Sequence, residues 1–269
     1  MKVNAYEPHY YQDPNFPIIF HYDTVLPNVN RPHWHENLEI LYITHGEPLT
    51  KINTEEVGAR PGDIVVIPSN ALHRTTCISG ETRYYCLIID RNFCSQFGFS
   101  LDLMTFQKVI RDPELSMLMD SIVKEFDERR NYFQAQILSS ILSLIVLLSR
   151  KHLAAAPPAL SKTQKSQLDM VKRSFLFIEE NYSKELTADG LAQHVGFNKF
   201  YFYHVFKELT GMTPIGYINS VRCRKAKELL STGRYNVGET AVLCGFDNLS
   251  YFSKTYKKYI GELPSETIS

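Results

Sequence analysis

Short apolar runs separated by turn-forming residues fill the segment from residue 18 to residue 90. Four of these runs are rich in β-branched and aromatic residues: Leu38–Thr44, Leu49–Asn53, Asp63–Ile67 and Tyr84–Ile89. Glycine and proline residues lie between them. Closely spaced short strands with such breakers are typical of an antiparallel sandwich or barrel. We therefore expect a β-sheet domain over about residues 1–105.

The hydrophobic period changes after residue 113. Apolar residues between Leu115 and Phe126 recur at the i, i+3, i+4 spacing of an amphipathic helix. The next stretch, from about Asn131 to His152, is apolar almost all round in its middle, which is typical of a helix covered on more than one side. We therefore expect a helix pair over about residues 113–152. One side would pack on its own domain and the other on a second subunit, which predicts a homodimer.

A linker follows the helix pair. The sequence Ala-Ala-Ala-Pro-Pro at 154–158 and the polar stretch after it are typical of an interdomain connection. We place the first domain at 1–152, the linker at 153–168 and a helical domain at 169–269.

The helical domain contains an internal repeat. Four residues recur 49 positions later, with Ala192, Val195, Gly196 and Phe197 matching Ala241, Cys244, Gly245 and Phe246. Six more recur 50 positions later, with Tyr201, Phe202, Phe206, Lys207, Gly211 and Pro214 matching Tyr251, Phe252, Tyr256, Lys257, Gly261 and Pro264. Each copy predicts a short helix, a turn at a glycine and a second helix. This is the layout of a helix-turn-helix unit, whose second helix enters the major groove of DNA.

One helix, Pro214–Ser231, is predicted between the two copies, because proline is tolerated in a first helical turn. At ~1.5 Å per residue it is roughly 27 Å long. This approaches the ~34 Å between successive major grooves on one side of B-DNA. One chain could therefore insert two helices into neighbouring grooves. A helical array that binds another protein is the alternative.

The C-terminal segment Leu186–Ser269, about a third of the chain, resembles the DNA-binding domain of the AraC/XylS family. The pattern that carries this resemblance consists of Tyr217, Ile218, Arg222, Ala226, Leu229, Leu230, Ala241, Gly245, Phe246, Tyr251, Phe252, Tyr256, Lys257, Gly261 and Pro264. The resemblance implies a two-unit reader of double-stranded DNA joined to an N-terminal sensor domain. It also implies RNA polymerase as a partner and favours activation over repression.

The resemblance also indicates which side chains contact DNA. Base-facing positions fall on Phe200, Tyr203 and His204 in the first unit and on Leu249, Ser250, Ser253 and Lys254 in the second. Lysine suits guanine, and an apolar side chain can meet the methyl group of thymine. Phosphate contacts are expected from Lys199, Lys207, Arg222, Lys257 and Lys258, and Asn198 and Asn248 at the helix starts complete the set. For any single lysine, a solvated surface is the alternative.

A second group of residues lies in the β-rich part. Because strand side chains alternate, His33, His35 and Glu39 can share one face, and His73 follows in a later segment. The order His-x-His, Glu39, Gly46 and then Gly62, Pro68 and His73 resembles the cupin barrel, with Asn70 replacing a glycine that is usual there. Three imidazoles and a carboxylate are also a ligand set for a divalent transition metal.

The resemblance to regulators with such a barrel favours an effector-binding role for His33, His35, Glu39 and His73, commonly toward a sugar. It implies no catalytic residue, and no cofactor is expected. Two alternatives stay open: a structural polar cluster, and a metal-dependent cupin enzyme or metal sensor fused to a DNA-binding domain.

Charge and composition support this division. The net charge is zero, but from Leu160 onward 15 basic residues face 11 acidic ones, a net of +4 that suits phosphate. The five cysteines show no paired spacing, as in a reduced cytosolic protein. The apolar run Ile137–Leu148 is too short to span a membrane, and no signal peptide is evident.

We therefore predict an α+β two-domain protein, with an N-terminal cupin-like β-barrel plus helical pair and a C-terminal all-α domain with two helix-turn-helix units. It would be a cytoplasmic, sequence-specific transcription regulator that responds to a small-molecule effector, without membrane association.

Overall fold

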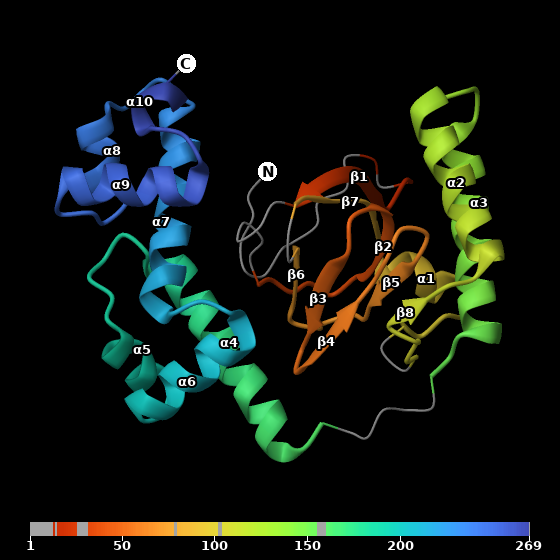
Figure 1. The fold of residues 1–269 in the computed structure, drawn as a ribbon, viewed down its shortest axis with the longest axis horizontal. Coiled ribbons are helices and arrows are strands. Elements are labelled where there is room, and N and C mark those ends of the chain that lie inside the picture. The colour runs from red at the N-terminus through yellow and green to blue at the C-terminus, as the bar shows by residue number, and fades with distance from the viewer. Residues whose placement is uncertain are drawn as a thin grey trace. The chain divides into compact units, whose positions relative to one another are not determined.

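The computed structural model describes residues 13, 15–25, 32–77, 80–101, 104–154 and 160–268. The chain divides into two compact units, one ending at Ser161 and the other beginning at Lys162 (Figure 1). The Ala-Pro core of the predicted linker, residues 155–159, and the start of the predicted barrel, residues 1–12, lie outside the described residues. The first helix of the second unit begins at Lys162, so residues 162–168 are helical rather than linker as predicted.

Two antiparallel sheets form the centre of the first unit. The larger has the order β1-β7-β2-β5-β8, with β1 Ile18–Val25, β7 Thr82–Ile89, β2 Leu38–His45, β5 Ile64–Ile67 and β8 Val109–Ile110. The smaller has the order β4-β3-β6, with β4 Glu55–Gly58, β3 Pro48–Ile52 and β6 His73–Cys77. The prediction of a closed barrel is wrong for the described strands, which pair in two separate sheets and so form a sandwich.

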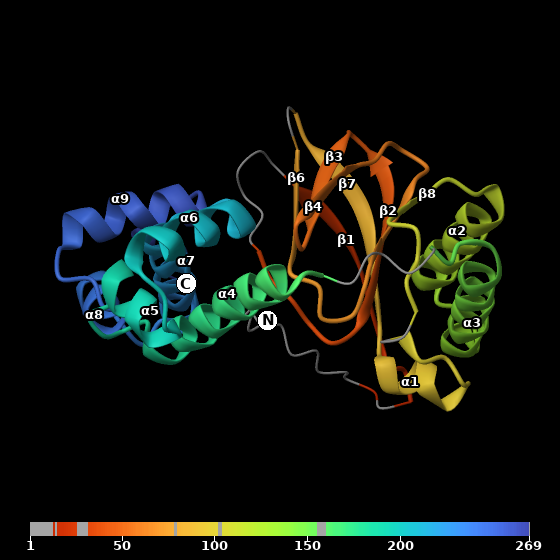
Figure 2. The same ribbon diagram turned by 90° about the horizontal axis from the view of Figure 1, so that it is seen from below.

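Both faces of the larger sheet are buried, because its strands are apolar at consecutive positions rather than at alternate ones. In β2, Leu38 and Ile40 belong to the core shared with the helices, whereas Leu41 and Ile43 belong to the core between the sheets. Figure 2 shows the helices against one side of this sheet and the smaller sheet against the other. The larger sheet is therefore the middle layer of the unit.

The predicted helix pair is confirmed as α2 Pro113–Glu128 and α3 Phe133–Lys151, and a short helix, α1 Arg91–Gln96, precedes it. Asp112 caps the start of α2 by accepting a hydrogen bond from the backbone N–H of Glu114. The same carboxylate lies 2.8 Å from Nε2 of His152, the residue that ends α3. This contact joins the start of α2 to the end of α3.

Among the described helices, α3 is long and apolar enough to cross a membrane by length and composition. This differs from the expectation that the apolar run Ile137–Leu148 is too short to span a membrane. Its inner stripe, which includes Ile137, Ile141, Leu144 and Leu148, is fully buried in the core that α3 shares with α2 and the larger sheet. The apolar character of α3 therefore has a structural use within the domain.

The second unit is helical. Its helices are α4 Lys162–Asn181, α5 Ala188–Val195, α6 Lys199–Thr210, α7 Pro214–Leu230, α8 Val237–Leu243, α9 Leu249–Ile260 and α10 Pro264–Thr267. The repeat is confirmed, since α5 and α6 form one helix-turn-helix unit and α8 and α9 form the other. The predicted connecting helix is α7, which starts at Pro214 behind the capping hydroxyl of Thr213.

Helix α7 contributes to the core of each helix-turn-helix unit. Near its start, the ring of Tyr217 stacks on Phe175 with 4.2 Å between centroids and lies edge-on to Phe206 of α6. Near its end, Ala226 and Leu230 are fully buried in the cluster that contains Phe252 of α9. A single straight element thus supports both units and fixes the distance between them.

Candidate functional site

Helix α6 presents the predicted base readers of the first unit to solvent. Phe200 is 84% exposed, and Tyr203 and His204 are also exposed. The opposite face carries Phe202 and Phe206, which are fully buried. An aromatic side chain as exposed as Phe200 contributes nothing to this core. The surface that α6 leaves open is the one that a recognition helix needs.

Helix α9 repeats this arrangement in the second unit. Leu249 is 52% exposed, Ser250 and Lys254 are exposed, and Ser253 is half-buried. Phe252 on the other face is fully buried. The predicted readers therefore share the open side of the helix, and the predicted phosphate-binding residues Lys257 and Lys258 are exposed in its last turn.

The two asparagines predicted at the interface cap the recognition helices. Oδ1 of Asn198 accepts a hydrogen bond from the backbone N–H of Tyr201 at 2.9 Å, and Oδ1 of Asn248 does the same for Tyr251 at 2.8 Å. Each cap satisfies one of the free N–H groups at a helix start. The side-chain oxygens of both asparagines are therefore committed to positioning α6 and α9.

Two of the predicted phosphate contacts behave differently from the rest. The ammonium group of Lys199 lies 2.8 Å from the carboxylate of Asp189 on α5. The guanidinium of Arg222 donates to the backbone carbonyls of Tyr182 and Lys184 at 2.7 and 2.8 Å and lies over the ring of Phe246. Nε and Nη2 of Arg222 are thus used inside the domain, where the residue is a structural link, and its contact with phosphate stays a prediction.

A further pair of residues orients the second recognition helix. Nδ2 of Asn219, on α7, donates a hydrogen bond of 2.7 Å to the hydroxyl of Tyr251, on α9. The sequence showed Tyr251 only as a repeated aromatic residue. The pairing joins residues 32 positions apart, and their spacing carries no signal for it.

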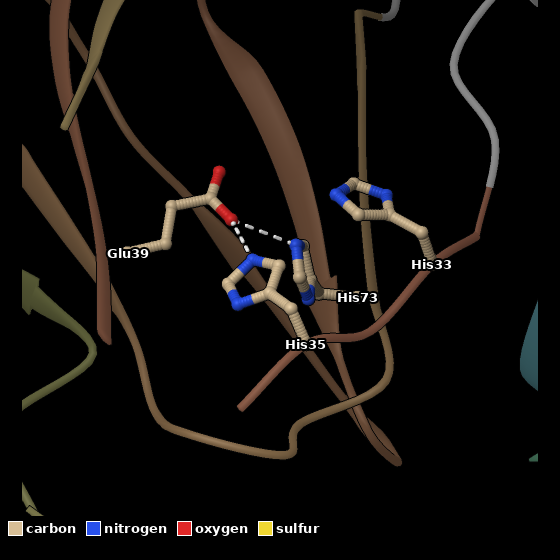
Figure 3. A group of neighbouring side chains, drawn as sticks. All are labelled: His33, His35, Glu39 and His73. Atoms are coloured by element: carbon tan, nitrogen blue, oxygen red, sulfur yellow. Dashed lines mark hydrogen bonds and ion pairs between the residues drawn. The ribbon is translucent and has the colours of Figure 1, made fainter. Parts of the chain in front are cut away.

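The predicted histidine and glutamate cluster converges between the sheets (Figure 3). Nε2 of His35 and Nε2 of His73 lie 2.8 and 2.9 Å from the same oxygen of Glu39, Oε2. These three side chains are buried, whereas His33 is half-buried, with its ring centroid 4.1 Å from that of His73. The convergence was predicted from strand alternation, but the described strand begins only at Leu38.

Backbone contacts bring His33 and the nearby histidines into place. His33 and His73 exchange two backbone hydrogen bonds, of 3.0 and 2.9 Å, in an isolated bridge outside the main ladder. Nδ1 of His35 lies 3.1 Å from the carbonyl oxygen of Asn37, and Nδ1 of His73 lies 2.9 Å from that of Ala71. The two rings are thus held from behind, with their Nε2 atoms directed at Glu39.

The surroundings of Glu39 favour its ionised form. Burial would raise the pKa of its carboxyl, but electrostatic attraction to His73 and hydrogen bonding to the rings of His35 and His73 outweigh burial and hold the pKa well below its ordinary value. The thiol of Cys86 contacts the other oxygen of this carboxylate, Oε1, at 3.4 Å. The cluster therefore offers a buried anion surrounded by imidazoles, a suitable site for a cation or for a polar ligand.

Comparisons with known proteins agree with both parts of the structure. Residues 17–145 match the family model described as an AraC-like ligand binding domain, and residues 191–269 match one described as a helix-turn-helix domain.

Individual relatives extend this likeness. The melibiose operon regulatory protein of Escherichia coli K12 is 26% identical over 247 residues, which are 87% of this chain and 82% of that protein. The HTH-type transcriptional activator AarP of Providencia stuartii is 37% identical over 101 residues, 37% of this chain and 73% of AarP. A solved structure of a probable AraC family regulator from Rhodopseudomonas palustris CGA009 is 31% identical, covers 37% of this chain and 94% of that chain, and has a TM-score of 0.36. With a two-unit helical reader behind an AraC-like ligand-binding domain, the chain belongs to the AraC family of transcription regulators.

Proposed function

We propose that the chain inserts α6 and α9 into two successive major grooves of its operator. One observation carries this proposal: two equivalent helices, each capped by an asparagine and exposed on its reading face, are joined by the single helix α7, which is packed into both cores. In this assignment Phe200, Tyr203 and His204 face bases in one groove. Leu249, Ser250, Ser253 and Lys254 face bases in the next.

Phosphate contacts come from the exposed lysines Lys199, Lys207, Lys257 and Lys258. They add affinity without reading sequence. The caps Asn198 and Asn248 set the helix starts against the backbone of the DNA, where the positive ends of the helix dipoles favour phosphate.

The first unit senses a small-molecule effector through the cluster of the half-buried His33 with the buried His35, Glu39 and His73. Two relatives that span both domains are regulatory proteins of the melibiose and arabinose operons, which favours a sugar as the effector. The relative AarP is a transcriptional activator, which favours activation for this chain. Activation would act through contact with RNA polymerase. A regulator with these partners works in the cytoplasm. The regulatory relatives that span both domains favour a regulator over the rival hypothesis of a metal-dependent enzyme.

The chain pairs with a second copy of itself through the outer side of α2 and α3. A groove of about 700 Å³ lies there. Its apolar lining consists of Met117, Leu118, Leu142, Val146 and Leu147. Met117 is 70% exposed in the single chain. Covering these side chains with the same surface of a second copy removes apolar area from water, which is the main favourable term in association.

Footprinting of the full chain on DNA upstream of its neighbouring genes tests the proposed function. We expect two protected stretches on one side of the duplex, about 10 base pairs apart, for each chain bound. Protection of a single stretch would contradict simultaneous insertion of α6 and α9. The absence of any protection on every candidate promoter would contradict the assignment of these helices as readers.

Replacing Lys254 with alanine should weaken binding to the specific operator more than binding to unrelated DNA. A lost base contact costs ~1–3 kcal/mol of discrimination, whereas a lost phosphate contact weakens binding to every sequence about equally. Lys258→Ala is the matched control, since Lys258 is exposed one helical turn further along α9. Titrations on both DNAs by fluorescence anisotropy measure the difference. Equal losses for Lys254→Ala on the two DNAs would show that this residue reads no base.

A further inference from the structure

We propose that Phe200 recognises the 5-methyl group of thymine, so that the groove read by α6 contains a thymine at a fixed position. This inference rests on the proposed insertion of α6 into the major groove and names a base that the helix reads there. Phe200 follows Lys199 at the start of α6, and its side chain is 84% exposed. A phenyl ring exposed to this extent adds nothing to the core of the helix-turn-helix unit.

The internal repeat shows where the two recognition helices differ. The inward-facing Phe202 of α6 is matched 50 positions later by Phe252 of α9, and both are fully buried. The positions on the open side carry different residues in the two copies: Phe200, Tyr203 and His204 on α6, and Ser250, Ser253 and Lys254 on α9. The two cores therefore need the same side chain, and the difference is confined to the surface proposed to meet DNA.

The chemistry of the major groove assigns a base to Phe200. A phenyl ring carries no N–H, O–H or oxygen atom with which to form an ordinary hydrogen bond. The base edges in the major groove present donors and acceptors, and the methyl group of thymine is the one apolar group among them. Placing the ring against another base edge would remove polar groups from water without giving them a partner, which is disfavoured. Phe200 therefore selects thymine at the position that it faces.

The start of α6 is held in place, so the ring of Phe200 is presented at a defined position. Asn198 caps the helix through the backbone N–H of Tyr201. The ring of Tyr201 stacks on Phe197 with 5.5 Å between centroids, and its hydroxyl accepts a hydrogen bond of 3.2 Å from Nε2 of Gln167 on α4. An aromatic side chain on such a fixed backbone loses little conformational entropy when it makes a contact.

The charges of the two helices indicate the same division of roles. On α6, the ammonium group of Lys199 lies 2.8 Å from the carboxylate of Asp189, and Nε2 of His204 lies 3.7 Å from that of Glu208. Helix α9 contains three lysines and no acidic residue. The positive charge that attracts phosphate is therefore concentrated on α9. Helix α6 adds discrimination through an uncharged contact.

The experiment uses the full chain and the DNA of the two stretches that the footprint protects. Each thymidine in these stretches is replaced in turn by deoxyuridine, which keeps every hydrogen-bonding group of the base pair and lacks only the methyl group. Fluorescence anisotropy measures the affinity for each DNA. We expect a loss of about fourfold at a thymine in one of the two stretches, equivalent to the ~0.8 kcal/mol of one buried methylene-sized group.

Two variants show whether Phe200 causes this loss. Phe200→Ser gives α6 the residue that α9 carries at the equivalent position, Ser250, and the response to deoxyuridine should disappear. Phe200→Leu should keep most of the response, because leucine is also apolar. Val242→Ala is the matched control, since Val242 is 72% exposed on α8 and lies outside the proposed reading face, and it should respond like the wild type. Circular dichroism confirms that each variant is folded.

Equal effects of deoxyuridine on the wild type and on Phe200→Ser would overturn the proposal, since the loss would then come from the DNA itself or from another side chain. The absence of an effect at every thymine would overturn it as well. In both cases the two protected stretches would remain, and the proposed insertion of α6 and α9 would stand. The absence of any footprint would instead overturn the proposed function together with this inference, which depends on it.

Discussion

Replacing Leu144 with glutamate should unfold the N-terminal unit. Leu144 is fully buried in the core that α3 shares with α2 and the larger sheet. The substitution removes an apolar side chain from this core and places an ionisable one there without a partner. Truncation of a buried leucine alone costs ~2–5 kcal/mol, and the buried carboxyl adds to it. This approaches the whole stability of a typical domain. Thermal melting followed by circular dichroism measures the effect.

Val146 provides the matched substitution, two residues along the same helix. It is half-buried and lines the outer groove instead of the core. Val146→Glu should leave the unit folded and convert the proposed dimer to monomers, as measured by sedimentation velocity. A folded Leu144→Glu protein would contradict the described packing of α3. A Val146→Glu protein that remained dimeric would move the subunit interface away from this groove.

Replacing Gly245 with alanine should destabilise the C-terminal unit by more than the same change at Gly196. Both glycines adopt positive φ angles, +78° and +83°, at equivalent places in the two repeats. A residue with a side chain costs roughly 1–2 kcal/mol in this conformation. At Gly245 an added Cβ would also lie 2.8 Å from the backbone carbonyl oxygen of Ser183. Overpacking of this kind typically costs a further ~1–3 kcal/mol.

Gly196 is the internal control for this prediction, because an added Cβ there meets nothing within 4 Å. Chemical denaturation of the two variants gives their free energies of unfolding. The backbone beside Gly245 is itself held by Arg222, which binds the carbonyls of Tyr182 and Lys184 on either side of Ser183. Moving the backbone at Ser183 away from an added Cβ would therefore break these hydrogen bonds. Equal losses of unfolding free energy in Gly245→Ala and Gly196→Ala would show that this backbone shifts without cost.

Most of the fold could be predicted where apolar residues set the period. The helix pair, the connecting helix and the two repeated units were predicted close to their observed bounds. The strand β6 was missed because its inward positions include His73 and Thr75, which are polar. Thr75 is satisfied inside by a hydrogen bond to Thr50. A strand whose inward-facing side chains are polar cannot be recognised from the spacing of hydrophobic residues, although its side chains pack in the same way.

The candidate sites divide along a similar line. The reading positions Phe200 and Lys254 were predicted from the family resemblance, and both side chains are exposed. The structural contacts of Arg222 were not predicted, because a basic residue on a predicted DNA-binding domain looks the same whether its partner is a phosphate or a carbonyl 38 to 40 residues away. The cluster around Glu39 was predicted, but the direction of each imidazole depends on the carbonyls of Asn37 and Ala71, which no spacing encodes.

The position of Glu39 within β2 links the proposed effector site to the helix pair α2 and α3. Its neighbours in the chain, Leu38 and Ile40, belong to the core shared with α2 and α3, on the far side of the same strand. If the effector binds Glu39 as proposed, its pull reaches the support of the helix pair across the thickness of one polypeptide backbone. We therefore expect substitutions in β2 that alter the proposed effector site to alter the proposed subunit interface as well.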